Sequence, residues 1–205
     1  MSGKFITLEG SEGAGKSTNL EVVQRVLDDH GIAHEVTREP GGTPLAEEIR
    51  ELILNNREEP VAASTELLLM FAARVQHVEQ KIKPLLADGV WVLCDRFIDA
   101  TYAYQGYGRG IGLQHIEALD AWLLESVQPD LTIYLDLPPE IGAARIANRE
   151  QDRMEQERAD FFAAVRSGYV ARAAQHNRIK TVDASGELAE VSTQVARVVT
   201  EFIKS

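Results

Sequence analysis

The sequence predicts an α/β fold, a doubly wound parallel sheet flanked by helices, from the alternation of two patterns. Short apolar runs with many β-branched and aromatic residues and little alternation are typical of strands buried on both faces. Between these runs lie amphipathic stretches, such as the one with Leu20, Val23 and Leu27 at helical spacing. In such a sheet, ligands bind at the carboxyl ends of the strands. The apolar runs cover residues 5–8, 33–37, 90–94, 131–135 and 179–182.

The composition fits one globular domain over residues 1–205. Hydrophobic residues make up 44% of the chain and charged residues 26%, as is ordinary for a folded domain, and no repeat or linker divides it. The net charge of −11 argues against a nucleic-acid polymer as partner, because a phosphate backbone would be repelled overall. Nucleotides stay compatible with this charge, since local Arg and Lys side chains can dominate a pocket.

Three absences favour a cytoplasmic protein without a membrane partner. The one cysteine, Cys94, allows no internal disulfide, which fits a reducing compartment. The N-terminal residues run into a strand-like segment and lack the apolar core of a signal peptide. No apolar stretch approaches the ~20 residues needed to span a bilayer.

Residues 10–17 match the phosphate-loop pattern G-x-x-x-x-G-K-[S/T] at every position. They lie between an apolar run and a helical stretch, which separates a phosphate loop from a chance glycine-rich turn. The glycines let successive backbone N–H groups point inward and hold an anion at a helix N-terminus. Lys16 adds a charge for the β- and γ-phosphates, and the Ser17 hydroxyl can ligate Mg²⁺.

Two more candidate sites directly follow predicted strands. Asp95 ends one strand, either as a surface carboxylate or as the acid that holds Mg²⁺ or its water, and the phosphate loop favours the second. Arg96 can clamp a substrate phosphate through two parallel hydrogen bonds. Arg38 precedes a turn of Pro and two glycines, so it is either a turn residue or a second phosphate contact.

Two segments with aromatic side chains have open interpretations. Phe71 and Arg74 share a helix face, either as a base-stacking ring and a base-reading guanidinium or as a core ring beside a surface arginine. Periodicity alone favours the core ring. Residues 101–110 either line a nucleoside pocket, with Tyr104 on the sugar and Thr101 near the base edge, or form a helix end and a loop.

Residues 145–158 break the alternation of strands and helices, because they are dense in both charges and poor in apolar side chains. Composition alone favours a solvated helical face with i,i+4 charge pairs. The alternative is a mobile cationic lid, which a phosphoryl-transfer enzyme needs at about this position.

Together these segments resemble the thymidylate kinase family, which phosphorylates dTMP with ATP. The resemblance covers essentially the whole chain and is most specific at 10–18, 38–43, 71–74 and 95–106. It implies the nucleoside-monophosphate-kinase fold, a five-stranded parallel sheet flanked by helices, with a short lid at about 148–158. It also implies dTDP formation in dTTP biosynthesis, with Mg²⁺ as cofactor, ATP and dTMP as partners, and a homodimer.

The resemblance assigns a role to each matching residue. Arg38 and Arg96 would hold the dTMP phosphate, Phe71 would stack on thymine, and Arg74 would donate to a ring carbonyl. The metal would be held by Ser17 and Asp95. The implied catalytic residues are Lys16, Asp95, Arg96, Arg149 and Arg153. The implied ATP-binding residues are Gly10, Ser11, Glu12, Gly13, Ala14, Gly15, Lys16, Ser17 and Thr18. The implied dTMP-binding residues are Glu12, Arg38, Phe71, Arg74, Arg96, Thr101, Tyr104 and Gln105.

The lid resembles that of the bacterial branch of the family. The phosphate loop carries no arginine at its variable positions, and Arg149 and Arg153 of the lid would neutralise the transferring phosphate instead. Ala100 departs from the family pattern, which usually has Ser four residues after the arginine matched by Arg96. This departure removes one possible hydroxyl contact.

Three other functions of phosphate-loop proteins are alternatives to thymidylate kinase activity. A kinase for another nucleoside monophosphate or a deoxynucleoside would share the phosphate loop and differ in its acceptor pocket. A GTPase switch is disfavoured because the chain has no Asn-Lys pair, and a nucleic-acid-dependent ATPase is disfavoured by the acidic charge. Cys94, Trp91 and Trp122 are expected to be packing residues.

Overall fold

Five parallel strands form one sheet in the computed structural model, which describes residues 3–124, 127–148 and 151–205. The strand order is β2-β3-β1-β4-β5, and all neighbours in the sheet are parallel. The predicted fold class is therefore confirmed, and each predicted apolar run forms a strand. The strands are β1 (Phe5–Glu9), β2 (His34–Arg38), β3 (Trp91–Asp95), β4 (Leu131–Asp136) and β5 (Ile179–Asp183).

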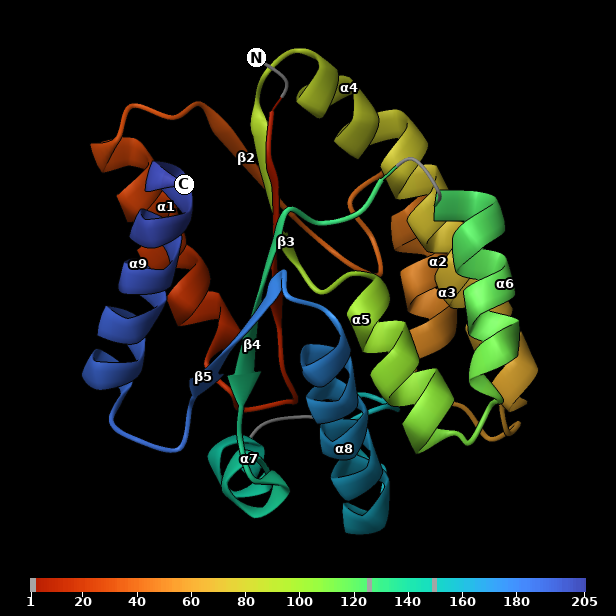
Figure 1. Cartoon of the computed structure of the whole chain (residues 1–205). Coiled ribbons are helices and arrows are strands. Elements are labelled where there is room, and N and C mark those ends of the chain that lie inside the picture. The colour runs from red at the N-terminus through yellow and green to blue at the C-terminus, as the bar shows by residue number, and fades with distance from the viewer. Residues whose placement is uncertain (1–2, 125–126, 149–150) are drawn as a thin grey trace.

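Helices cover both faces of this sheet (Figure 1). Helices α1 (Lys16–Asp29) and α9 (Leu188–Lys204) lie side by side on one face, where their apolar stripes pack against the sheet. The layer on the other face is larger and packs in two further apolar clusters. Its helices are α3 (Ala63–His77), α4 (Lys83–Ala87), α5 (Ile98–Thr101), α6 (Leu113–Leu124) and α8 (Ala159–Gln175). Two more helices, α2 (Pro44–Leu54) and α7 (Pro139–Ile146), pack on this framework.

Burial differs between the centre and the edges of the sheet. All residues of β1 are buried, whereas β2 has one buried residue, Thr37, and β5 has two, Ile179 and Val182. The prediction that every strand is buried on both faces is therefore wrong for these two strands. Their position explains the difference, because an edge strand has a neighbour on only one side and its outer face is less completely covered.

Two helical segments widen into π-helical turns. The segment η1 (Val78–Ile82) joins α3 to α4, and η2 (Tyr102–Gly108) extends α5. Segments of this kind are rare and often occur at functional sites. Here η2 carries Tyr104 and Gln105, both predicted site residues, so this stretch is helical and not the loop that the sequence left open.

The strand register brings the candidate residues to one edge of the sheet. Leu8 pairs with Asp95, and Asp95 also pairs with Arg38, so β1, β2 and β3 end level with one another. The phosphate loop, the turn after β2 and Arg96 therefore meet at the carboxyl edge. None of the helices in the described part of the chain combines the length and the apolar composition of a membrane-spanning segment.

Candidate active site

The phosphate loop curls from the end of β1 into α1. Gly10, Gly13 and Gly15 have φ values of 147°, 75° and 84°, which side chains other than hydrogen rarely permit. Lys16 Nζ donates to the carbonyl oxygens of Gly10 and Ser11 at 3.1 and 3.3 Å, which holds its ammonium group over the loop. The glycine spacing in the sequence thus reflects a backbone shape that suits an anion.

A cavity of about 520 Å³ opens in front of this loop. Its walls come from the phosphate loop, the turn after β2, α2, α3, the segment from β3 to η2, α7 and residues 152–155. The predicted site residues in its wall are Glu12, Gly13, Gly15, Lys16, Ser17, Thr18, Arg74, Asp95, Arg96, Thr101, Tyr104 and Gln105. The structure therefore brings most of the predicted site together in one space.

Arg96, Glu12 and Tyr104 form a polar cluster in the cavity wall. Arg96 Nη2 donates to Glu12 Oε1 at 2.8 Å and to the Tyr104 hydroxyl at 3.1 Å. The Tyr104 hydroxyl donates to both Glu12 oxygens, at 2.9 and 2.8 Å. Burial alone would lower the pKa of the Arg96 guanidinium. The electrostatic effects of Tyr104 and Glu12 are larger and hold this pKa well above its ordinary value. A phosphate that enters the cavity would thus meet a charged arginine whose present partner is a carboxylate.

The backbone of Arg96 is held in an unusual shape. Among the described residues it is the one non-glycine residue with positive φ, at 67°. Its N–H donates to the Leu8 carbonyl at 2.9 Å, and the N–H of Phe97 donates to Glu9 Oε1 at 2.7 Å. Strand β1 therefore fixes the turn that directs Arg96 into the cavity, and strain of this kind is common at functional sites.

Asp95 has a carboxylate oxygen that fits a metal or a metal-bound water. Asp95 Oδ1 is buried and accepts no hydrogen bond, and Arg96 Nη1 lies 3.8 Å from it, beyond hydrogen-bonding distance. Ser17 is exposed and lines the same cavity. No group of three or more His, Cys, Asp or Glu could hold a metal in the described ranges, so most oxygen ligands would come from a bound phosphate and water.

Arg74 is buried, with 3% of its side chain exposed, and each of its donor groups has a partner. Its Nε donates to Glu39 Oε2 at 2.6 Å, its Nη1 to Thr101 Oγ1 at 2.8 Å and its Nη2 to the Phe97 carbonyl at 3.0 Å. His77 Nδ1 in turn donates to Glu39 Oε1 at 3.0 Å. These contacts fix the plane of the guanidinium at the cavity wall, and the sequence alone assigned no role to Glu39 or His77.

Phe71 does not reach the cavity. It is 2% exposed and belongs to the apolar cluster on its face of the sheet, with the Arg74 guanidinium carbon 5.6 Å from its ring centroid. Met70, four residues before Arg74, lines the cavity instead. Spacings of three and four both put two residues on one helix face, so spacing alone could not choose between these positions. In this structure the cavity wall therefore contains the thioether of Met70 and not the ring of Phe71, and the predicted contact of Phe71 with thymine stays a prediction.

Arg50, for which the sequence predicted no role, lines the cavity, whereas Arg38, the predicted phosphate contact, does not. Arg38 is 45% exposed, pairs with Glu47 at 2.8 Å and is absent from the cavity wall. Arg50 on α2 lines the cavity, and its Nη1 donates to the Pro40 carbonyl at 2.8 Å. Burial, followed by the nearby charge of Arg38, lowers the pKa of Arg50. Sequence analysis missed Arg50 because it is one arginine among several charged residues on an amphipathic helix.

The segment 151–158, which we call the lid segment, covers part of the cavity. Asp152, Met154 and Glu155 line the wall, whereas Arg153 does not. Arg153 instead donates through Nε to the Ile53 carbonyl at 2.7 Å. Arg149, the other arginine predicted to be catalytic, lies outside the described residues.

Arg145 on α7 braces the phosphate loop from outside the cavity. Its Nη1 donates to the Gly13 carbonyl at 3.0 Å, and its guanidinium also contacts the Ala184 carbonyl at 3.3 Å. Close packing supports the same contact, since a Cβ on Gly142 would lie 2.5 Å from the Glu12 carbonyl oxygen. The sequence alone could not indicate this contact, because Arg145 and Gly13 are far apart in the chain and are brought together only by the fold.

Known proteins are similar to this chain in sequence over nearly its whole length. The model of a family described as "Thymidylate kinase" matches residues 8–195. A thymidylate kinase of Alcanivorax borkumensis is 56% identical over 204 residues, covering 98% of each chain. One of Ectopseudomonas mendocina is 52% identical, covering 100% of this chain and 99% of its own. One of Teredinibacter turnerae is 51% identical, covering 99% of this chain and 100% of its own.

Proposed function

The chain belongs to the thymidylate kinase family, and we propose that it transfers the γ-phosphoryl group of ATP to the phosphate of dTMP. The products are ADP and dTDP, a precursor of dTTP. One observation supports this most directly: a single cavity has the phosphate loop in one wall and the fixed guanidinium of Arg74 in another. A triphosphate at the loop and a base at Arg74 leave the acceptor phosphate between them, beside Arg96.

The acceptor phosphate is already an anion, so the reaction needs no strong general base. It needs the two substrates aligned and the negative charge of the migrating group neutralised. Lys16 and the loop amides would hold the donor phosphates, while Arg96 and Arg50 would hold the acceptor phosphate. The incoming phosphate would replace Glu12 as the partner of the Arg96 guanidinium. Glu12 and Tyr104 would then contact the deoxyribose.

The base would be read by Arg74, Thr101 and Gln105. A guanidinium only donates hydrogen bonds, so Arg74 suits the O4 carbonyl of thymine and disfavours the amino group that cytosine has there. Met70 offers an apolar, polarisable wall for the ring and its methyl group. Shape and donor pattern together favour a pyrimidine with a carbonyl at this position.

Ser17 and Asp95 would hold Mg²⁺, with the metal's other oxygens supplied by phosphate and water. The metal would supply positive charge that neutralises the negative charge developing on the phosphates. Asp95 supports this role through its buried, unpartnered oxygen, which a metal-bound water would satisfy.

The lid segment would close over the aligned phosphates and exclude water that otherwise hydrolyses ATP. Arg149 and Arg153 are proposed to neutralise the migrating group. For Arg153 this requires release, once ATP is bound, from its contacts with the Ile53 carbonyl and with Glu66 Oε2. A double substitution of both arginines should lower kcat far more than it weakens dTMP binding, and an unchanged kcat would remove them from the mechanism.

An acceptor panel tests the proposed reaction. The purified chain is assayed by coupled ADP release with ATP, Mg²⁺ and dTMP, dUMP, dCMP, dGMP, AMP or thymidine as acceptor. We expect the highest kcat/KM with dTMP and a strong loss with dCMP. Higher turnover of dGMP, AMP or free thymidine would favour the rival small-molecule kinases. ATP hydrolysis stimulated by DNA or RNA would favour the nucleic-acid-dependent ATPase.

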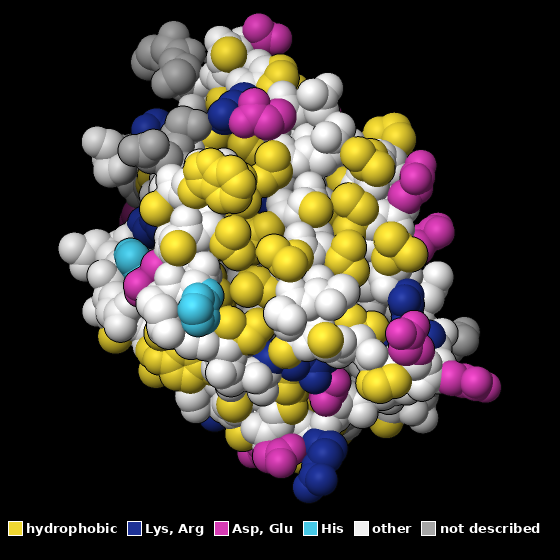
Figure 2. Space-filling view, turned by 90° about the vertical axis from the view of Figure 1, so that its right-hand side faces the viewer, with side chains coloured by type: hydrophobic (Ala, Val, Ile, Leu, Met, Phe, Trp, Pro, Cys, Tyr) yellow, Lys and Arg dark blue, Asp and Glu magenta, His cyan; other side chains and the backbone are white. Residues whose placement is uncertain are grey.

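A second copy of the chain is the proposed partner, and it would bind the face formed by α2, α3 and α6. Figure 2 shows hydrophobic side chains gathered over the centre of this side of the molecule. Exposed apolar residues on these helices include Leu52, Leu68 and Trp122, at 51%, 58% and 77% exposure. The expectation that Trp122 is a packing residue is therefore wrong for the single chain. A two-fold pair would bury the same residues on both copies, which fits an apolar self-complementary face.

Light scattering after size exclusion tests this pairing. The wild-type chain should have the mass of two copies, and Leu68→Glu or Trp122→Glu should shift it to one copy. Val170→Glu is the matched control, because Val170 is 49% exposed on α8, away from this face. A wild-type mass of one copy at micromolar concentration would contradict the proposal.

A cytoplasmic location is part of the same proposal. ATP and dTMP are small anions in solution, and the reaction requires no lipid. Cell fractionation should recover the protein with the soluble fraction, and recovery with washed membranes would count against this location.

A further inference from the structure

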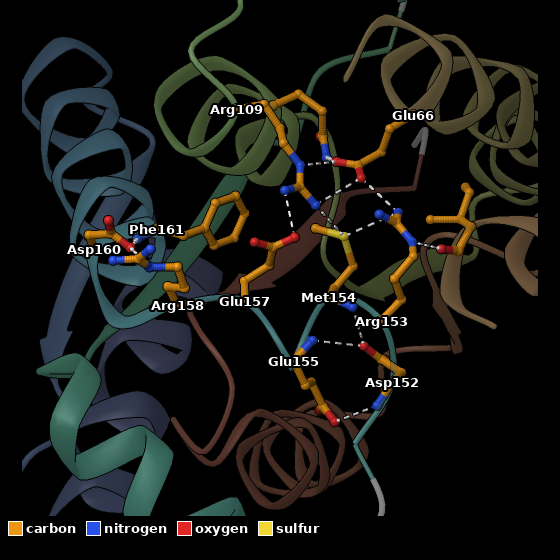
Figure 3. Close-up of polar contacts among 12 residues, drawn as sticks. Glu66, Arg109, Asp152, Arg153, Met154, Glu155, Glu157, Arg158, Asp160 and Phe161 are labelled. Carbon is orange, nitrogen blue, oxygen red and sulfur yellow. Dashed lines mark hydrogen bonds and ion pairs between the residues drawn. The ribbon is translucent and has the colours of Figure 1, made fainter. Parts of the chain in front are cut away.

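Glu66 on α3 is a fully buried carboxylate that the proposed reaction leaves without a role. It does not line the cavity, yet it contacts Gln105, which does, and two arginines that contact or belong to the lid segment. Its Oε1 accepts from Gln105 Nε2 at 2.9 Å and from Arg109 Nε at 3.1 Å. Its Oε2 accepts from Arg109 Nη2 at 3.0 Å and from Arg153 Nη2 at 2.6 Å. Figure 3 shows Glu66 between the two arginines, with the lid segment beneath them.

Arginines on both sides of Glu66 hold the lid segment. Arg153 makes a backbone contact as well, because its N–H donates to the Leu54 carbonyl at 3.0 Å. With its Nε on the Ile53 carbonyl, it satisfies the last carbonyls of α2, which favours a cation at that helix end. Arg109 reaches the other end of the segment, where its Nη1 donates to Glu157 Oε1 at 2.6 Å. Met154 lies between these anchors and lines the cavity.

The base side of the cavity depends on the same carboxylate. Gln105 lines the cavity, and its amide nitrogen faces Glu66. An ionised carboxylate can only accept, so it forces the amide N–H₂ toward itself and leaves the amide oxygen on the opposite side. That oxygen is the acceptor that the N3–H of a thymine ring needs.

Glu66 carries the negative charge that this arrangement requires. Burial alone would raise its pKa, but hydrogen bonds from Arg109, Gln105 and Arg153 outweigh burial and hold the pKa below its ordinary value. Four donor contacts fill both oxygens of one ionised carboxylate. Removing its charge therefore affects the amide and both lid anchors at once.

We propose that Glu66 is a positioning residue that couples the acceptor-base side of the cavity to the lid segment. A base that binds Gln105 stabilises the amide orientation that Glu66 imposes, and Glu66 in turn holds Arg153 and Arg109 against the lid segment. Occupation of the base side thus favours the ordered lid before ATP reacts. The inference rests on the proposed function for the identity of the acceptor.

Limited trypsin digestion measures the coupling without any turnover. The lid segment contains tryptic sites after Arg153 and Arg158, and the Arg158 side chain is 87% exposed. Cleavage at these sites is followed by mass spectrometry, with and without dTMP at a concentration shown by titration to be saturating. In the wild-type chain we expect dTMP to slow lid cleavage about tenfold. In Glu66→Gln we expect faster cleavage without dTMP and a protection factor close to one.

Asp99→Asn is the matched control for the loss of a buried charge. Asp99 is also buried and accepts from two arginines, Arg172 at 2.9 Å and Arg178 at 2.7 Å, neither of which contacts the lid segment in the described structure. This variant should lose thermal stability as Glu66→Gln does and keep the protection of the lid by dTMP. A merely structural role for Glu66 predicts equal behaviour of the two variants.

Arg109→Gln is a second variant that tests the coupling by the same digestion if Glu66→Gln does not fold. Arg109 is 17% exposed, and its loss leaves Glu66 paired with Arg153 while it frees Glu157. We expect partial loss of protection by dTMP and a severalfold rise in ATP hydrolysis relative to dTDP formation. Full protection by dTMP in Glu66→Gln or, failing that, in Arg109→Gln would overturn the coupling. No protection in the wild-type chain with no dTMP binding would instead refute the proposed function.

Discussion

At the scale of single residues, the site depends on which side of a helix each side chain faces. Met70 and Phe71 are neighbours in sequence, yet one lines the cavity and the other lies in the core. A helix turns by about 100° per residue, so adjacent side chains point in different directions. Their substitutions should therefore separate binding from stability.

Met70→Ala should raise the KM for dTMP about tenfold, because ~1.4 kcal/mol of apolar contact with the ring is lost. Its melting temperature should change little. Phe71→Ala should lower the free energy of unfolding by about 3 kcal/mol or more through the cavity it leaves. Steady-state kinetics and thermal melts check both variants. The reverse pattern would mean that Phe71 contacts the base after all.

Arg50→Met should weaken dTMP binding more than Arg38→Met. Arg50 lines the cavity, whereas Arg38 is paired with Glu47 outside it. Loss of one charge-assisted hydrogen bond costs about 2 kcal/mol, so the KM for dTMP should rise about thirtyfold for Arg50→Met. A larger effect of Arg38→Met would show that Arg38 moves into the cavity when phosphate binds, as the family resemblance implies.

At the scale of elements, the sequence predicted strands better than it predicted contacts between distant segments. The five apolar runs and the phosphate loop depend on local pattern, and the structure confirms the strands within about one residue. Arg50, Glu39 and Glu66 were missed because their partners lie on other elements. A buried acid such as Glu66 looks like any helix surface residue until Arg109 and Arg153 are brought beside it.

The contact between α7 and the phosphate loop should control ATP binding. A Cβ at Gly142 would lie 2.5 Å from the Glu12 carbonyl oxygen, so Gly142→Ala should push the loop out of shape. We expect the KM for ATP to rise about tenfold, as an estimate for a loop displaced by a few tenths of an ångström. Gly31→Ala is the control, since nothing lies within 4 Å of its Cβ, and it should change only stability. Equal ATP KM values would contradict this role for the contact.

At the scale of the whole molecule, one buried acid gives the fold an uncommon dependence on pH. Burial, helped by the charge of Asp99, raises the pKa of Glu9 from 4.5 to about 8. The folded state therefore keeps a proton that the unfolded chain has lost. This contribution to stability is fully present below about pH 4.5 and is lost as the pH rises to about 8.

Glu9→Gln should remove this dependence, because an amide resembles the protonated acid and can still accept from the Phe97 N–H. The stability of the variant relative to wild type should rise with pH between about 5 and 8, by up to ~1.4 kcal/mol per unit. Denaturant titrations at several pH values measure it. The pKa values of Glu12, Glu66 and Asp99 are lowered, so their contributions to the free energy of unfolding are lost only at acid pH. The wild-type chain and Glu9→Gln share these losses, which therefore cancel in the difference between them. A constant difference across the range would show that Glu9 is ionised in the fold.

The two tryptophans lie in different surroundings, so intrinsic fluorescence can report whether two copies of the chain associate. Trp91 packs against Phe202 with ring centroids 5.9 Å apart, whereas Trp122 is 77% exposed. Solutes such as acrylamide should therefore quench the emission of Trp122 as long as that face meets water. If two copies come together there, dilution of the protein should shift the emission to longer wavelength at the concentration where they separate.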